Sequence, residues 1–103
     1  MNLVLGSAYL HMLFADLDSS YVLATAAYNA GPAKARSWRA ALSESTESAV
    51  FIETIPYYET RGYVKNVLSN TLTYSVLLGN PIKNFTSFIG RIHPSYATNP
   101  NIP

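Results

Sequence analysis

Apolar side chains recur at steps of three and four residues in two long stretches of the chain, which is the spacing of amphipathic helices. The first stretch predicts a helix at about residues 3–15, where polar side chains separate Leu3, Leu10, Leu13, Phe14 and Leu17. The second predicts a helix of about five turns at residues 59–78, with apolar positions at Tyr63, Val64, Val67, Leu68, Leu72, Val76 and Leu77.

Three shorter helices are predicted between these two. Residues 21–28 are rich in alanine, whose small side chain lets neighbouring backbones approach closely, and we expect this helix at the buried centre of the domain. Asp18, Ser19 and Ser20 form a turn whose hydroxyls can accept the free amides at its start, and Gly31 suits a left-handed cap at its end. Pro32 can begin the next helix, at about residues 32–41, and a short one follows at 50–54.

The last part of the chain has a different composition. Residues 81–103 hold four of the six prolines and three asparagines, which predicts an extended tail that Phe85, Phe88 and Ile89 pin to the body. No alternating pattern is long enough for a strand, so the fold class is all-α. We expect a partial helical domain at residues 1–80, followed by a Pro/Asn-rich tail at 81–103.

Charge and composition exclude several function classes. The net charge of +1 gives no basis for binding nucleic acid, and the absence of cysteine excludes disulfides and thiolate sites. Two histidines, His11 and His93, are too few for a metal cluster, so neither a metal nor a cofactor is expected. Polar residues interrupt the apolar N-terminal stretch, which therefore predicts neither a signal peptide nor a transmembrane segment.

Three segments resemble, in order and spacing, the later half of the catalytic (SLT) domain of bacterial soluble lytic murein transglycosylases. They are residues 5–10 (LGSAYL), 24–32 (ATAAYNAGP) and 52–67 (IETIPYYETRGYVKNV). The first segment is a weak signal by itself, whereas the last two together are highly specific. The resemblance spans about residues 3–78.

The resemblance implies a lysozyme-like, all-α domain similar to goose-type lysozyme, with a glycan groove. It implies non-hydrolytic cleavage of the MurNAc–GlcNAc bond of peptidoglycan, giving 1,6-anhydromuropeptides, in the periplasm or cell envelope. In the family a single glutamate, in a Glu-Ser motif before a Gly-Leu-Met-Gln stretch, acts as acid and then as base. Neither motif occurs in these 103 residues, so we expect the chain to be inactive alone.

Five residues are carried over from the family's motifs as substrate-binding candidates. The resemblance places the hydroxyl of Tyr28 near the catalytic carboxyl, although Tyr28 could also be a core aromatic. Asn29 could bind a sugar or brace the turn at the helix end. Glu59, Arg61 and Tyr63 would contact the ligand's peptide or sugar, since a carboxylate recognises an ammonium and a guanidinium recognises a carboxylate.

Plainer readings of the charged residues remain open. Glu59 could be a favourable charge in the first turn of a helix, and Arg61 could form a surface ion pair. Glu53 could replace the missing acid, but a solvated helix residue is the simpler interpretation. Lys34, Arg36 and Arg39 could meet an anionic glycan or lipid, although such a charge run usually forms a solvated face.

Two hypotheses therefore stand. The chain is either part of a lytic transglycosylase that lacks its acid, or a stand-alone module that binds peptidoglycan or a partner without catalysis. In both, the expected partners are peptidoglycan glycan strands and peptide stems. A self-sufficient module should cover its own core, whereas part of a larger domain should expose a large apolar patch.

Overall fold

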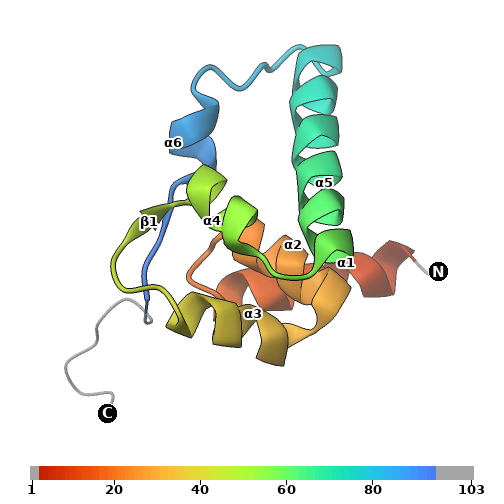
Figure 1. Ribbon diagram of the computed structural model, residues 1–103. Coiled ribbons are helices and arrows are strands. Elements are labelled where there is room, and N and C mark those ends of the chain that lie inside the picture. The colour runs from red at the N-terminus through yellow and green to blue at the C-terminus, as the bar shows by residue number, and fades with distance from the viewer. Residues whose placement is uncertain (1–2, 95–103) are drawn as a thin grey trace, which may run out of the picture.

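A computed structural model describes residues 3–94, with side chains described from Ala8 onward. The described part is almost entirely helical, so the predicted all-α class is confirmed (Figure 1). In chain order the elements are α1 (Leu3–Asp16), α2 (Tyr21–Ala30), α3 (Pro32–Ala40), β1 (Thr46–Glu47), α4 (Ser48–Thr54), α5 (Tyr58–Leu77), α6 (Phe85–Ile89) and β2 (Arg91–Ile92).

Helix α2 is the centre of the fold, as its alanine content predicts. It packs against α1, α3 and α5, and every residue from Val22 to Ala27 is buried. Ser20 caps its start by accepting the amide of Leu23 at 3.1 Å. Gly31 ends it with a positive φ of 97°, and Pro32 opens α3.

The observed helix ends lie within two residues of the predicted ones. Helix α2 runs to Ala30 instead of residue 28, and α4 begins at Ser48 instead of residue 50. The longest helix, α5, stands upright on the layer formed by α1, α2 and α3 (Figure 1). Its first turns therefore meet the end of α2, and its far end projects away from the body.

The prediction of an extended tail is wrong for the described part of residues 81–103. Phe85, Phe88 and Ile89 have helical spacing and lie in α6, whose start Asn84 caps by accepting the amide of Ser87 at 3.0 Å. Burial of apolar side chains outweighs the Pro/Asn composition here, because Ile89 and Ile92 both belong to the core. The predicted attachment of this segment to the body is confirmed, because Phe85 and Phe88 pack against the core and Ile89 is part of it. Residues 95–103 lie outside the described part.

Two short strands also depart from the prediction of helices and loops alone. β1 and β2 pair antiparallel, with Thr46 opposite Ile92 and Glu47 opposite Arg91. Strands of two residues are too short to produce an alternating pattern that sequence could reveal. The pairing continues into α4, where the hydroxyl of Ser48 donates to the carbonyl of Ile89 at 2.8 Å.

Arg39 departs from the charge run in which the sequence places it. Its side chain is buried, forms an ion pair with Asp18, and donates from Nε to the carbonyl of His93 at 2.7 Å. It thereby joins α3 to the turn after α1 and to the segment after β2.

Across residues 3–94, no helix combines the length and apolarity needed to cross a membrane.

Candidate substrate-binding site

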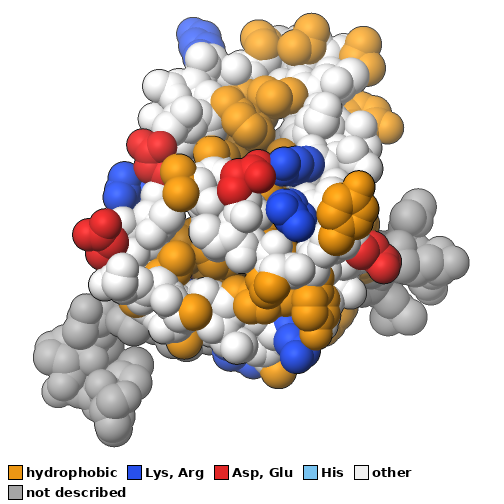
Figure 2. Space-filling model, viewed as in Figure 1, with side chains coloured by type: hydrophobic (Ala, Val, Ile, Leu, Met, Phe, Trp, Pro, Cys, Tyr) orange, Lys and Arg blue, Asp and Glu red, His pale blue; other side chains and the backbone are white. Residues whose placement is uncertain are grey.

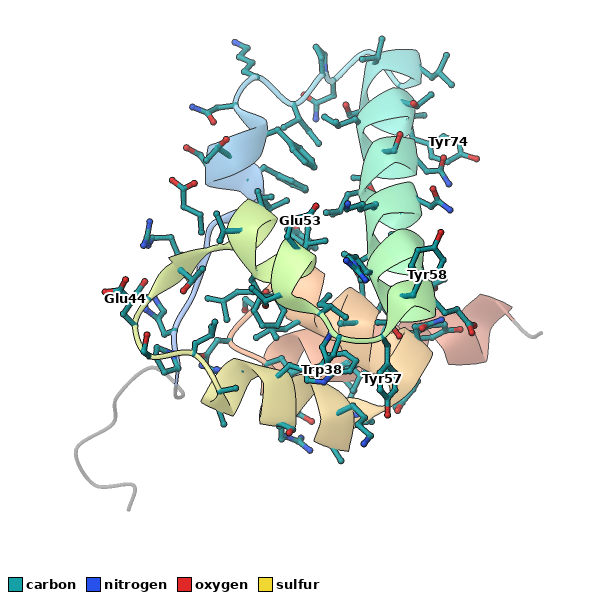
Figure 3. All side chains as sticks on the ribbon, viewed as in Figure 1. Trp38, Glu44, Glu53, Tyr57, Tyr58 and Tyr74 are labelled. Carbon is teal, nitrogen blue, oxygen red and sulfur yellow. The ribbon has the colours of Figure 1, made fainter. Side chains whose placement is uncertain are left out.

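A pocket of about 530 Å³ opens where the first turns of α5 meet the end of α2. It brings together four of the five predicted site residues, Asn29, Glu59, Arg61 and Tyr63. Tyr58, Gly62, Lys65 and Asn66 complete the lining. In Figure 3, Tyr58 projects from the first turn of α5, on the side away from Tyr57.

Asn29 braces the two helices that form the pocket. Its Oδ1 accepts a hydrogen bond from the hydroxyl of Thr60 at 2.7 Å, and Thr60 is only 2% exposed. The cap at the end of α2 is instead the amide of Gly31, which donates to the carbonyl of Ala27. Asn29 thus fixes α5 against α2 and still presents part of its side chain to the pocket.

Tyr28 is the predicted residue that does not line this pocket. Its ring lies 5.9 Å from that of Tyr9 on α1, at an interplanar angle of 44°. It also lies close enough to Tyr63 to influence the titration of that phenol. Tyrosines from α1, α2 and α5 therefore adjoin one another beside the pocket.

The phenol of Tyr63 is held in its neutral form. Burial, and secondarily the nearby Tyr28, raise the pKa of Tyr63 above its usual value of 10.0. A neutral phenol can both donate and accept a hydrogen bond. Tyr63 can therefore serve either an oxygen or an amide of a ligand.

The charged lining residues differ in their surroundings. Glu59 is exposed in the first turn of α5, where a carboxylate suits the helix dipole. Arg61 lies over the ring of Tyr58 at 5.8 Å, and no carboxylate among residues 8–94 forms an ion pair with it. Its guanidinium is thus placed on an aromatic face and remains available to an anionic group.

Glu53 is poorly suited to replace the missing acid. It is exposed and pairs with Lys65, whose Nζ lies 2.6 Å from Glu53 Oε1. The hydrogen bond from Lys65 is the largest influence and lowers the pKa of Glu53 below 4.5; desolvation opposes it, and the charges of Lys65 and Arg61 add to the lowering. A general acid at neutral pH needs the opposite shift.

Four lining residues, Tyr58, Gly62, Lys65 and Asn66, are absent from the sequence-based set. Tyr58 and Lys65 lie seven residues apart, so they share one face of α5 with Glu59, Gly62 and Asn66. Extending the motif by helical spacing would have found them. Within residues 8–94, no cluster of His, Asp or Glu is suited to hold a metal ion.

Comparison with known proteins identifies the family. Two family profiles match in succession, the transglycosylase SLT domain at residues 1–51 and the soluble lytic transglycosylase helical domain at residues 54–82. The soluble lytic murein transglycosylase of Escherichia coli (strain K12) is 37% identical over 79 residues, which are 77% of this chain and 12% of that protein. The chain belongs to the SLT transglycosylase family. The Salmonella typhimurium enzyme of the same name is 38% identical over 78 residues, 76% of this SLT chain and 12% of that protein.

A solved structure agrees with this assignment. The X-ray structure of an inactive mutant of lytic transglycosylase Slt from Pseudomonas aeruginosa matches the SLT chain with a TM-score of 0.73 and 44% identity. The match covers 79% of this chain and 13% of that one. The SLT chain thus spans about an eighth of the length of the relatives it matches.

The pocket lies where the two matched regions meet. Asn29 belongs to the region matched by the SLT domain profile, and the other lining residues belong to the region matched by the helical domain profile. The hydrogen bond between Asn29 and Thr60 joins the two regions. The geometry of the pocket therefore depends on the packing of α5 against α2.

Proposed function

We propose that this chain forms a wall of the substrate groove of a peptidoglycan lytic transglycosylase, and that the pocket at the start of α5 binds the glycan or its peptide stem. The observation that carries the proposal is the convergence of Asn29, Glu59, Arg61 and Tyr63 on one pocket. A peptide stem carries ammonium and carboxylate groups, which suit Glu59 and Arg61 respectively. The neutral phenol of Tyr63 would bind an amide or a sugar hydroxyl.

Catalysis would require a glutamate that these 103 residues do not supply in the family's motif. Tyr28, beside Tyr63 and outside the pocket, would support that glutamate from the position that the family resemblance gives it. We therefore expect the chain alone to bind peptidoglycan fragments without cleaving them. The proposed place of action is the cell envelope, and more narrowly the periplasm.

Binding is tested with isotopically labelled chain and soluble muropeptides. We expect amide shifts at the start of α5, and affinity about fivefold lower in Arg61→Gln, because an exposed ion pair contributes up to about 1 kcal/mol. Glu59→Gln and Tyr63→Phe should also bind more weakly. Lys83→Gln, at an exposed lysine outside the pocket, is the matched control for lost charge. Equal affinity of all four variants would reject the site.

Turnover is tested after extending the chain at its N-terminus with the glutamate-bearing segment of a relative. The extended protein should release anhydromuropeptides, and the 103-residue chain should not. Release by the 103-residue chain that Glu53→Gln or Glu59→Gln abolishes would contradict the proposal. Comparing intact muropeptides with peptide-free glycan strands then separates stem recognition from sugar recognition. A substitution that removes a contact with the stem should reduce turnover less on strands that have no stem.

A further inference from the structure

We propose that Trp38, Tyr57 and Lys34 form a second carbohydrate-binding surface, which binds a pyranose ring with a carboxylate beside it. We call these three residues the aromatic platform. The inference rests on the proposed function, since it extends contact with the same polymer beyond the pocket. No motif of the family carries Lys34 or Trp38 into the predicted site.

The platform is a corner built from two separate elements. Trp38 lies on α3, and Tyr57 immediately precedes α5; their ring centroids are 5.0 Å apart at an interplanar angle of 74°. Figure 3 shows the two side chains next to each other below the start of α5. Two rings in edge-to-face contact form one joined apolar surface, and the C–H face of a sugar ring can lie against an exposed aromatic ring.

Solvent reaches this corner in the described structure. Tyr57 is 44% exposed, although it contacts Trp38, which packs against the core. Its side chain does not cap α5 by a hydrogen bond. Tyrosine and tryptophan are enriched among the residues that contribute most to binding energy at interfaces.

Lys34 gives the platform its charge preference. Its Nζ lies 5.5 Å from the centroid of the Tyr57 ring, and within residues 8–94 it has no ion pair with a carboxylate. An ammonium beside an aromatic ring can bind an anion on a ligand whose apolar face contacts the ring. In a peptidoglycan strand such an anion is either a free lactyl carboxylate or a carboxylate of the peptide stem.

The platform is continuous with the pocket through the chain itself. Tyr57 and Tyr58 are neighbours, and Tyr58, which is 85% exposed, lines the pocket with Arg61. In Figure 3 their side chains point to opposite sides of the start of α5, so the platform and the pocket lie on either side of this turn. Figure 2 shows hydrophobic and Lys or Arg side chains side by side over this region.

Trp38 is the single tryptophan of the chain, so its fluorescence reports on the platform specifically. We expect a saturable emission change with peptide-free glycan strands and a weaker response to neutral oligomers of N-acetylglucosamine. Lys34→Gln should weaken the binding of carboxylate-bearing strands about fivefold and leave the neutral oligomers unaffected. Tyr57→Leu should weaken both about fivefold. Lys83→Gln and Tyr74→Leu are the matched controls outside the platform.

Intact muropeptides identify the source of the anion. A loss in Lys34→Gln on peptide-free strands assigns the lactyl carboxylate, whereas a loss only with stems present assigns the stem. No loss on either substrate overturns the proposal, as does unchanged Trp38 emission at concentrations that shift the amides of the pocket. That second result leaves the proposed function intact. Conversely, a Trp38 response that Arg61→Gln leaves unchanged, with no shifts at the pocket, keeps the platform and rejects the pocket. If Tyr57→Leu lowers the melting temperature, its weaker binding could reflect partial unfolding, and the test of the platform then rests on Lys34→Gln. An exposed lysine can be replaced with little effect on folding.

Discussion

At the residue scale, environment decides which predicted side chains can act as expected. Tyr63 was placed by a motif, but its raised pKa follows from burial and from the neighbouring Tyr28. Arg39 was placed in a charge run, yet it is a buried partner of Asp18 and His93. Sequence spacing could not show that Arg39 is buried, because its partners lie 21 and 54 residues away in the chain.

Replacing Tyr63 should change how stability depends on pH. Since the folded pKa of Tyr63 is raised above 10.0, its contribution is fully present below that pH and is lost as pH rises through the folded pKa. Tyr63→Phe cannot lose a proton there. The unmodified chain should therefore lose stability relative to Tyr63→Phe as the pH rises from about 10 through the raised folded pKa. Urea unfolding across this range measures the difference, and a constant difference would contradict the assignment.

At the scale of elements, the sequence predicted the five longer helices but not the contacts between segments that are distant in the chain. Periodicity, the cap at Ser20 and the break at Gly31 and Pro32 are local signals, and the structure has helices where they predict them. Helix α6 and the β1–β2 pair depend on contacts between residues about 45 positions apart. Likewise, the motifs predicted four lining residues of the pocket, but only the packing of α5 on α2 relates them to Tyr58 and Lys65.

The segment from α6 to β2 should therefore contribute strongly to stability. Ile89 and Ile92 are buried in the core, so Ile89→Ala and Ile92→Ala should each lower the free energy of unfolding by about 2–4 kcal/mol. Thr86→Ala, at an exposed position of α6, is the control and should change it by less than about 0.5 kcal/mol. Chemical denaturation measures all three.

The same experiment bears on the predicted division at residue 80. A chain ending at residue 80 loses both isoleucines together with the carbonyl that Ser48 binds. We expect it to unfold at much lower denaturant concentration than the full chain. If instead the shortened chain and both alanine variants match the full chain in stability, residues 81–94 are dispensable and the division at residue 80 is supported.

At the scale of the whole molecule, apolar surface is concentrated at the far end of α5. Tyr74, Val76, Leu77 and Leu78 are all more than half exposed, and Leu78 reaches 81%. Hydrophobic side chains gather at this upper end in Figure 2, where Figure 1 places the end of α5. A further shallow pocket beside it is lined by Thr71, Tyr74, Ser75, Leu78, Asn80 and Ile82. Such a patch favours the hypothesis that the chain is part of a larger unit over that of a self-sufficient module.

This difference can be tested without any ligand. If the end of α5 is a surface that normally packs against other protein, the isolated chain should self-associate, because apolar area left in water favours contact with itself. The double variant Leu77→Glu and Leu78→Glu should sediment as a monomer under conditions where the unmodified chain associates. Its melting temperature should hardly change, since both side chains are exposed and contribute little to the core. Thr73→Glu, an exposed polar position on the same helix, controls for added charge and should leave association unchanged. A monomeric unmodified chain would instead favour the stand-alone module, because its apolar end would then be tolerated in water without a partner.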